Sequence, residues 1–509
     1  MSEGKPEPEG LDFSLGVEIA DVAEGEILQG HVRGESALLI RRGDEFFFIG
    51  DTCTHYHGPL AAGLVVADTI RCPWHHACFS LRSGEALRAP ALDPVSCWRA
   101  ERKGTLVIAT EKLEPIAGAK IAPPPTLGKV VIVGGGAAGL AAAQTLRKEG
   151  YGGAIALVSA DEAAPYDRPN LSKDYLAGSA PEDWLPLRAG RFYEDNRIEL
   201  ELRSRAESID VEGRSLRLDN GARLGFDALL LATGAEPVRL TVPGADHPRV
   251  RYLRSLADSR AIIAAAAAAS RVVVVGASFI GLEVAASMRA RGLEVHVVAP
   301  DAVPMQKTLG EEFGRFIRAT HEAHGVVFHL GETVASIDDQ QVVLSGGGKI
   351  SAELVVVGIG VRPALALAEG AGLAIDRGVL VDEYLETSAP GIFAAGDIAR
   401  WPDRTTGERI RIEHWVTAQR QGQTAARNIL GRRERFEAAP FFWSQHYDVI
   451  VNYVGHAPSW DRIEISGDIE AMDCAVSYFR RDRKLAVATI FRDLENLRAE
   501  VGFEEATGA

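Results

Sequence analysis

The sequence predicts a multidomain chain in which a small all-β domain precedes two Rossmann-like dinucleotide-binding domains and a C-terminal α+β domain. Three observations predict this order. The 509 residues exceed what one hydrophobic core normally supports. From Phe13 to about Thr110, short β-rich runs alternate with turn residues, which is typical of an all-β domain. Beyond that point apolar strands alternate with alanine-rich helical stretches, the pattern of parallel α/β sheets.

Changes in local composition predict where these domains begin and end. We expect the all-β domain at residues 1–112 and a proline-rich linker at 113–128, because three consecutive prolines, Pro123 to Pro125, favour extended polyproline geometry. Two glycine-rich strand-to-helix turns divide the α/β part. We expect the first dinucleotide-binding domain at 129–245 and 363–436, the second at 246–362, and the aromatic-rich C-terminal domain at 437–509.

Composition and charge exclude several classes of protein. Hydrophobic residues make up 46% and charged residues 25%, as in ordinary soluble proteins, and no run of 18 uncharged apolar residues could span a membrane. The net charge of −15 disfavours binding to nucleic acid or to anionic lipid. The first residues, Met1 to Pro6, lack the basic and apolar regions of a signal peptide. We therefore expect a soluble, cytoplasmic protein with no nucleic-acid or membrane partner.

Four of the five cysteines fall in the first hundred residues, beside several histidines. Cys53 and His55 form one closely spaced pair, and Cys72 and His75 form another. Two thiolates and two imidazoles on two loops are the ligands of a Rieske [2Fe-2S] cluster, with cysteine on one iron and histidine on the other. A structural zinc site with the same ligands, a chance grouping and ordinary core residues are the alternatives.

The residues around these four resemble the Rieske family. The matching residues are Tyr56, Gly58, Pro59, Leu60, Ala77, Cys78 and Phe79. High-potential Rieske proteins carry an extra cysteine in each loop, joined as a disulfide, and Gly58 and Trp74 stand at those positions here. The resemblance therefore implies a ferredoxin-type centre of lower potential. We expect His57 and His76 to face solvent or to lie behind the ligands, and Cys78 and Cys97 to be small buried side chains.

Two segments of the α/β part share one design. An apolar strand runs into Gly134, Gly136 and Gly139 in the first segment, and into Gly276, Ser278 and Gly281 in the second. The first glycine permits a tight turn, the middle residue lets backbone approach a pyrophosphate, and the last allows close helix packing. The following helix N-terminus presents unpaired N–H groups to phosphates. Two such turns without a ligand are the alternative interpretation.

Further motifs resemble the ferredoxin reductases that serve bacterial oxygenases, and the resemblance covers residues 129–509. They are Tyr166–Lys173, Leu230–Ala235, Gly358–Pro363, Gly391–Asp397 and Glu413–Trp415. With the Rieske domain in front, the whole chain resembles the apoptosis-inducing-factor-like flavoproteins. This implies an FAD-binding domain, an NAD(P)-binding domain and a C-terminal reductase domain, in the order given above.

The resemblance also implies roles for single residues. Arg168 and Lys173 would contact FAD phosphate or flavin oxygens, and Asp397 the ribityl chain. The catalytic candidates are Glu283, near the nicotinamide, and Trp415, beside the isoalloxazine. The remaining cofactor-binding candidates are Glu413, also beside the isoalloxazine, and Thr233, Gly234 and Gly360 in the shared motifs. Surface ion pairs for Arg168 and Glu413, and a core position for Trp415, are the alternatives.

Two departures from the family pattern bear on the nucleotides. The strand that follows the first glycine turn ends at Ser159, where many flavoproteins place a glutamate for the adenosine ribose, so Asp161 is the expected substitute. The corresponding strand of the second domain ends at Ala299, without the acid that selects NAD, and no arginine stands nearby to select NADP. The choice of nicotinamide stays open, with a slight preference for NADH.

These features predict an NAD(P)H-dependent electron-transfer flavoprotein. Family relatives that reduce disulfides use a Cys-x-x-Cys pair, which this sequence lacks. Hydride would therefore pass from nicotinamide to FAD, and single electrons to the Rieske cluster and on to an external acceptor that the sequence does not identify. Two alternatives are a fused reductase and ferredoxin of an oxygenase system, and a redox sensor whose nicotinamide-bound state alters its partners.

Overall fold

The computed structural model describes residues 10–114 and 121–508; residues 115–120 of the predicted linker, and Met1 to Pro6, lie outside this range. The chain divides into two compact units. The first comprises Met1–Ala122, Lys148–Tyr151 and Asp493–Gly502, and the second comprises Pro123–Arg147, Gly152–Arg492 and Phe503–Ala509. The C-terminal helix α10 (Asp493–Gly508) thus contributes most of its length to the unit formed by the N-terminal residues.

The first unit contains two sheets, as expected for an all-β domain. The larger has the order β1-β3-β4-β5-β10-β11-β2. Its strands are β1 (Leu11–Asp12), β2 (Val17–Glu18), β3 (Ile27–Val32), β4 (Glu35–Arg42), β5 (Glu45–Gly50), β10 (Cys97–Lys103) and β11 (Leu106–Lys112). The smaller sheet is an antiparallel meander of β6 (Leu64–Val66), β7 (Thr69–Arg71), β8 (Cys78–Ser80) and β9 (Ala86–Arg88). The loop between β7 and β8 carries the second pair of predicted ligands.

The first dinucleotide-binding domain is built on a parallel sheet of order β14-β13-β12-β18-β30. Its strands are β12 (Lys129–Val133), β13 (Ala154–Val158), β14 (Ile198–Glu201), β18 (Ala228–Leu231) and β30 (Ile392–Ala394). Val130 to Val133 are all buried, which explains why this strand is apolar throughout, since a parallel sheet is covered on both faces. Helices α1 (Ala137–Lys148) and α9 (Trp415–Ile429) belong to this domain.

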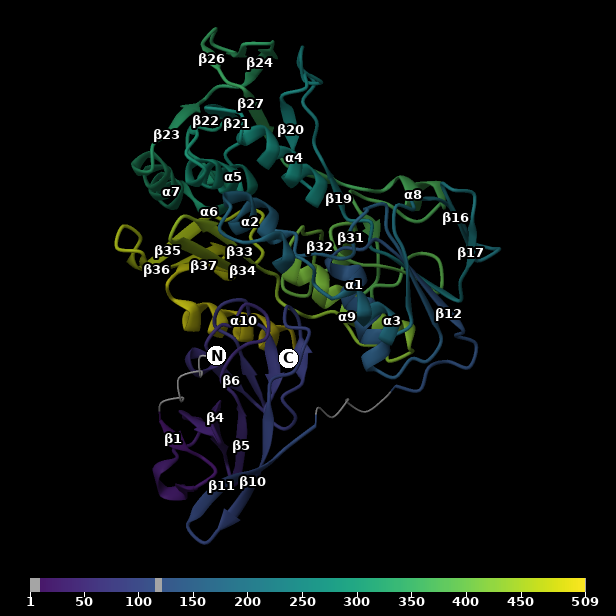
Figure 1. Ribbon diagram of the computed structural model, residues 1–509, viewed down its shortest axis with the longest axis vertical. Helices are drawn as coiled ribbons and strands as arrows, with labels where there is room; N and C mark the ends of the chain where they lie inside the picture. The colour runs from purple at the N-terminus through teal and green to yellow at the C-terminus, as the bar shows by residue number, and fades with distance from the viewer. Residues whose placement is uncertain (1–9, 115–120, 509) are drawn as a thin grey trace, which may run out of the picture. The chain divides into compact units, whose positions relative to one another are not determined.

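The second dinucleotide-binding domain repeats the design with the order β20-β27-β21-β22-β23 (Figure 1). Its strands are β20 (Val250–Tyr252), β21 (Arg271–Val275), β22 (Glu294–Ala299), β23 (Val326–Leu330) and β27 (Leu354–Val357). Its helices are α4 (Leu256–Ala266), α5 (Phe279–Ala290), α6 (Gln306–Leu309) and α7 (Glu311–Ala323). A capping box fixes the start of α4, because Ser255 Oγ accepts from the Asp258 backbone N–H at 3.1 Å while Asp258 Oδ2 accepts from that of Ser255 at 2.8 Å.

Smaller elements complete the two domains. Two antiparallel three-stranded sheets follow their parallel strands: β15 (Ala206–Asp210), β16 (Ser215–Leu218) and β17 (Arg223–Gly225) in the first, and β24 (Val334–Ile337), β25 (Gln341–Leu344) and β26 (Lys349–Ser351) in the second. The remaining strands are β19 (Ala235–Pro237), β28 (Val361–Pro363), β29 (Val379–Leu380), β31 (Ala399–Pro402) and β32 (Arg409–Ile410), and the remaining short helices are α2 (Asp174–Ala177), α3 (Gly190–Asp195) and α8 (Ala366–Gly370).

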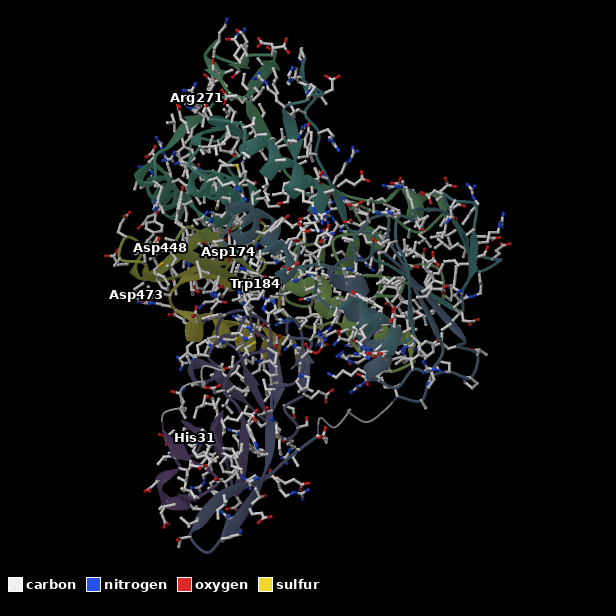
Figure 2. The ribbon with its side chains drawn as sticks, in the orientation of Figure 1. His31, Asp174, Trp184, Arg271, Asp448 and Asp473 are labelled. Atoms are coloured by element: carbon white, nitrogen blue, oxygen red, sulfur yellow. The ribbon has the colours of Figure 1, made fainter. Side chains whose placement is uncertain are left out.

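An antiparallel sheet follows the dinucleotide-binding domains, in the order β33-β34-β37-β36-β35. Its strands are β33 (Phe441–His446), β34 (Val449–Gly455), β35 (Arg462–Asp468), β36 (Asp473–Arg480) and β37 (Arg483–Ile490). One hydrophobic core joins this sheet to the second dinucleotide-binding domain, since Val451 and Tyr478 cluster with Val274 and Phe313. Figure 2 labels Asp448 and Asp473 in this region; it also labels Trp184, whose side chain is largely exposed.

Candidate functional site

A cavity of about 750 Å³ lies in the second unit. Ten of the residues predicted from the sequence line it: Gly136, Arg168, Lys173, Gly234, Ser278, Glu283, Gly360, Asp397, Glu413 and Trp415. They come from both dinucleotide-binding domains, and the loops that follow β12 and β21 both reach the cavity. This is the place where α/β sheets bind ligands, beyond the carboxyl ends of their central strands.

The two glycine turns have the same backbone geometry. Gly134 has φ +118° and Gly276 has φ +110°, values that side-chain-bearing residues rarely adopt. A Cβ at Gly134 would overlap the carbonyl oxygen of Ala232, and one at Gly276 would overlap that of Gly358. Glycine at these positions therefore lets each turn lie directly against the neighbouring strand end.

Gly139 and Gly281 play the packing part expected of the third glycine. A Cβ on either would overlap the carbonyl oxygen of the turn glycine, Gly134 or Gly276, that begins its motif. Both α1 and α5 can then start close to the strand before them. The helix N-termini face the cavity, where their free N–H groups can bind phosphate.

Two further candidates bind protein groups instead of lining the cavity. Asp161 Oδ2 accepts from the Tyr166 hydroxyl at 2.7 Å, and Asp161 Oδ1 accepts from the Ala163 backbone N–H at 3.2 Å. Thr233 Oγ1 donates to the Ala364 carbonyl at 3.0 Å. The predicted ribose contact of Asp161 stays a prediction, and the carboxylate would have to share its Tyr166 bond to make it.

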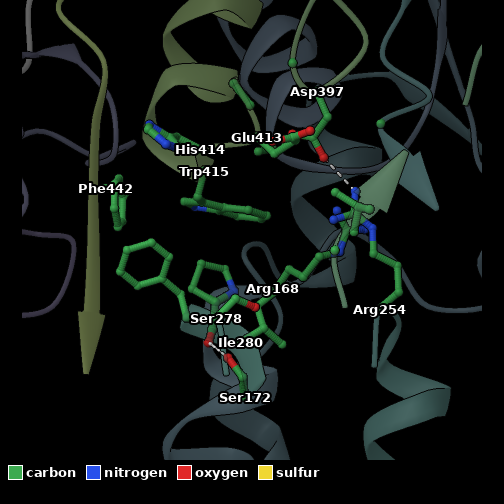
Figure 3. A pocket seen from close by; sticks show the side chains of 18 of the residues that line it. Arg168, Ser172, Arg254, Ser278, Ile280, Asp397, Glu413, His414, Trp415 and Phe442 are labelled. Carbon is green, nitrogen blue, oxygen red and sulfur yellow. Dashed lines mark hydrogen bonds and ion pairs between the residues drawn. The ribbon is translucent and has the colours of Figure 1, made fainter. Parts of the chain in front are cut away.

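Arginine side chains and carboxylates lie close together at the cavity wall. Arg254 Nη2 is 2.8 Å from Asp397 Oδ2, and burial together with the nearby Arg254 charge lowers the pKa of Arg168. Arg168 Nε is buried and has no hydrogen-bond partner among the described residues. Figure 3 shows Arg168 on one side of Trp415, with Asp397 and Glu413 on the other. A guanidinium with one unsatisfied N–H beside the open Gly136 turn fits a cofactor that carries phosphate.

Aromatic side chains form another wall. Trp415 projects into the cavity from the start of α9 (Figure 3), and His414 packs on Phe442 with ring centroids 4.5 Å apart. Phe279 meets Phe442 edge to face at 4.8 Å. Burial lowers the pKa of His414 to about 3, so its imidazole is neutral at pH 7. Flat apolar walls of this kind suit planar rings such as flavin and nicotinamide.

The catalytic candidate Glu283 is almost fully buried and ion-paired. Its Oε2 is 2.9 Å from Lys173 Nζ and accepts from Ser172 Oγ at 2.5 Å, and its Oε1 accepts from Ser444 Oγ at 2.6 Å. Of these partners the sequence predicted only Lys173. Ser172 lies beside it in the motif already quoted, whereas Ser444 and Arg254 carry no local signal that could have identified them.

The four predicted cluster ligands lie in the first unit, on two loops with matching backbone hydrogen bonds. The Cys53 N–H donates to the Gly58 carbonyl at 2.9 Å, and the Cys72 N–H donates to the Ala77 carbonyl at 2.8 Å. In each loop the residue four places after the cysteine, His57 or His76, has positive φ and donates its N–H to that cysteine's carbonyl.

The ligand side chains converge two by two. His55 Nδ1 and His75 Nδ1 are 3.3 Å apart, and the Cys53 and Cys72 thiols are in contact, which lowers the pKa of Cys53. Burial lowers the pKa of His55 to about 3 and so keeps a neutral, metal-binding imidazole. Among residues 10–114 and 121–508, no three such ligands surround one ion. A cysteine pair beside a histidine pair fits the two irons of a Rieske cluster, with cysteine on one iron and histidine on the other.

The second cluster loop is held by α10. Glu500 is fully buried in the first unit; its Oε2 accepts from Arg71 Nη1 at 2.7 Å, and its Oε1 lies 3.2 Å from His76 Nδ1. Arg71 and His76 flank the segment that carries Cys72 and His75. As expected, His76 lies behind the ligands and His57 is exposed, while Cys78 and Cys97 are buried.

Comparison with known protein families assigns all three parts of the chain. Residues 15–99 match the Rieske [2Fe-2S] domain, residues 128–422 the pyridine nucleotide-disulphide oxidoreductase family, and residues 441–499 the reductase C-terminal domain. The chain therefore belongs to the pyridine nucleotide-disulphide oxidoreductase family, with a Rieske domain in front. It is an FAD-dependent NAD(P)H oxidoreductase of the ferredoxin reductase type, and its cofactors are FAD, NAD(P)H and a Rieske [2Fe-2S] cluster.

Individual relatives agree with this assignment. The chain is 31% identical to human apoptosis-inducing factor 3, over 96% of this chain and 83% of that protein. It is 36% identical to putidaredoxin reductase of Pseudomonas putida, over 72% of this chain and 89% of that protein. A crystal structure of the covalent putidaredoxin reductase-putidaredoxin complex superposes with a TM-score of 0.72 and 34% identity, over 74% of this chain and 93% of that chain.

The predicted fold class and cofactors are confirmed by these comparisons. The roles given to single residues remain predictions, supported by their positions in the cavity and in the cluster loops. None of the helices within the described part of the chain is both long and apolar enough to cross a membrane.

Proposed function

We propose that this chain passes electrons from NAD(P)H through FAD to its own Rieske cluster, and from there to an external one-electron acceptor. The observation that carries the proposal is the presence, in one chain, of a reductase cavity and a complete set of cluster ligands. No cysteine is found among the described residues that line the cavity. A dithiol relay beside the flavin, as used by disulfide reductases, has no counterpart there, so a different acceptor is needed.

When bound, FAD would accept a hydride from NAD(P)H, and FAD and the cluster together would let its two electrons leave one at a time. The protein supplies position and charge. The glycine turns at Gly134 and Gly276 and the cationic Arg168 would bind the nucleotide phosphates, and Trp415 would limit where the planar rings lie. Glu283, ion-paired with Lys173, places a proton-accepting carboxylate at the cavity wall.

The external acceptor is proposed from the relatives. Putidaredoxin reductase has been crystallised in covalent complex with putidaredoxin, and other relatives are ferredoxin reductase components of dioxygenase systems. These relatives favour a second candidate function, in which this chain fuses the reductase and the ferredoxin of an oxygenase system. Both candidates share the internal path from flavin to cluster.

Anaerobic stopped-flow mixing with NADH or NADPH tests that path. We expect the flavin absorbance to bleach first and the cluster absorbance afterwards. His75→Ala should keep flavin bleaching and the reduction of ferricyanide, which can take electrons directly from flavin, while losing the cluster phase. Cluster bleaching that precedes flavin bleaching would refute the path. Very slow flavin reoxidation by ferricyanide, with a long-lived nicotinamide complex, would favour the redox sensor instead.

A further inference from the structure

A line of hydrogen-bonded side chains leads from the cavity wall into the protein. It begins at Glu283 on α5, which is 4% exposed and accepts from Ser444 Oγ at 2.6 Å. Ser444 Oγ is 3.2 Å from His446 Nε2, and His446 Nδ1 is 3.2 Å from His321 Nε2. Ser444, His446 and His321 have no exposed surface. Strand β33 carries the middle two residues and packs against both α5 and α7 (Figure 1).

The donors in this line all point toward Glu283. A carboxylate only accepts, so the Ser444 hydroxyl donates to Glu283 and must itself accept from His446 Nε2–H. Burial lowers the pKa of His446 to about 3 and that of His321 well below its ordinary value, so both imidazoles are neutral. Each then carries a single N–H. His446 Nδ1 accepts from His321 Nε2–H, and His321 Nδ1 is left as a lone pair.

The far end of the line is an unsatisfied acceptor. His321 Nδ1 is buried and has no hydrogen-bond partner among the described residues. His324, the residue that follows the last residue of α7, is exposed and stacks on Tyr447 with ring centroids 3.6 Å apart. Tyr447 also packs on His321 at 5.1 Å, and Arg289 is the nearby cation. At the other end, Lys173 is the charged group that faces His446.

A second pair of hydrogen-bonded histidines in the same unit does not lead to the cavity, so contact between two imidazoles alone does not make a proton path. His296 Nδ1 is 2.9 Å from His329 Nε2, and His296 Nε2 ends on Glu294, a half-exposed surface carboxylate. The line from His321 differs because it is buried throughout and ends on a carboxylate that lines the cavity.

We propose that His321, His446 and Ser444 form a proton path that charges and discharges Glu283, with solvent reaching His321 Nδ1 when the stacked His324 and Tyr447 rings beside it separate. This inference rests on the proposed function. A hydride carries one proton and two electrons, so a flavin that accepted one would gain one negative charge, and the departing nicotinamide would carry away the matching positive charge. One proton bound at His321 Nδ1 would shift every N–H and O–H one step inward and leave Glu283 as a neutral carboxyl group.

After this transfer the N–H groups of His321 and His446 and the O–H groups of Ser444 and Glu283 all point away from the cavity. Proton transfer in the opposite direction restores their original orientation. If the two electrons then left singly for the one-electron acceptor, the proton of the hydride would be released and Glu283 would give its own proton back along the path. One proton enters and two leave, so each NAD(P)H yields one NAD(P)⁺, one net proton and two electrons. No imidazolium has to persist at any stage, which agrees with the lowered pKa values of both histidines.

Proton uptake can be measured directly on the holoenzyme. NADH is mixed anaerobically with the protein in weak buffer that contains a pH-indicator dye, and dye and flavin absorbance are followed together. We expect uptake of one proton per FAD in the same phase as flavin bleaching. His446→Gln keeps hydrogen-bonding groups but cannot relay a proton, so it should slow uptake about 100-fold relative to bleaching. The matched control, His329→Gln in the surface pair, should behave like the unaltered protein.

One further variant and two spectroscopic readouts keep the test independent of turnover and of misfolding. Ser444→Ala, checked for normal FAD content, should give the same delay as His446→Gln. Nitrogen NMR of labelled histidine should show Nε2–H tautomers for His321 and His446 in the oxidised protein and Nδ1–H tautomers after dithionite reduction. Infrared difference spectra should gain a protonated carboxyl band on reduction, which Glu283→Gln removes.

The outcomes separate this proposal from the one on which it rests. Uptake that keeps pace with bleaching in His446→Gln and Ser444→Ala, or tautomers that do not change on reduction, would overturn the proton path while leaving the electron path intact. Normal proton uptake without subsequent cluster bleaching would overturn the electron path instead.

Discussion

Removing the Glu500 carboxylate should destabilise the N-terminal unit strongly. Glu500 is fully buried and the Arg71 side chain is 9% exposed, so neither water nor salt can replace the lost partner. Removing one member of a buried ion pair costs about 3–5 kcal/mol, because the remaining charge loses a partner in a place that water does not reach. For Glu500→Ala we therefore expect a loss of about 4 kcal/mol, which with a urea slope of about 2 kcal/mol/M lowers the unfolding midpoint by about 2 M.

The visible circular dichroism of the Rieske cluster, recorded against urea without oxygen, measures this midpoint in the full-length holoprotein. Glu45→Ala is the matched control, because Glu45 Oε2 is also 2.7 Å from an arginine, Arg82 Nη2, in the same unit, but that pair is exposed. It should leave the midpoint nearly unchanged. Equal, small shifts for Glu500→Ala and Glu45→Ala would show that the buried pair does not hold the cluster loop.

Three other predictions address the remaining sites. Gly139→Ala should abolish FAD binding, and Gly281→Ala should abolish NAD(P)H binding with FAD retained, because the added Cβ would overlap the carbonyl oxygen of Gly134 or Gly276. Flavin content and titration with NADH measure these effects. Loss of flavin from both variants would contradict the assignment of the two turns. Folding lowers the pKa of His414 from an ordinary value of 6.5 to about 3, so between these pH values the unfolded chain binds more protons. Stability therefore decreases by about 1.4 kcal/mol for each unit by which the pH is lowered in this range. His414→Gln should lower that slope in urea titrations of the flavoprotein at pH 7 and pH 5; an unchanged slope would mean that His414 is not buried in its neutral form. Cys72→Ser should remove both irons and leave one FAD per chain, and loss of flavin from this variant would show that the two units fold as one.

The sequence predicted those features whose cause is local. A buried strand that runs into Gly134 or Gly276 can be recognised because turn, strand and helix start lie within about ten residues. The cluster ligands were found for the same reason, since each loop supplies a cysteine and a histidine within four positions. Arg168 and Asp397 were expected from family motifs and do line the cavity.

The features that the sequence missed are joined only by tertiary packing. Ser444, His446 and His321 look like ordinary core residues until β33 is placed against α5 and α7. Arg254 reaches Asp397 across 143 positions of sequence, and Glu500 reaches Arg71 across 429. Asp161 shows the opposite case, in which a plausible local substitute for the missing glutamate is already hydrogen-bonded to Tyr166.

The place of Asp493–Gly502 in the first unit also has a consequence for synthesis. A ribosome makes the chain from its N-terminus, and early domains usually fold while later ones are still being made. Here the loop that carries Cys72 and His75 lacks one of its contacts until Glu500 has been made, 429 positions after Arg71. Residues 123–492, most of them in the second unit, would therefore be synthesised before the iron-binding loop is complete, so we expect iron to be inserted late.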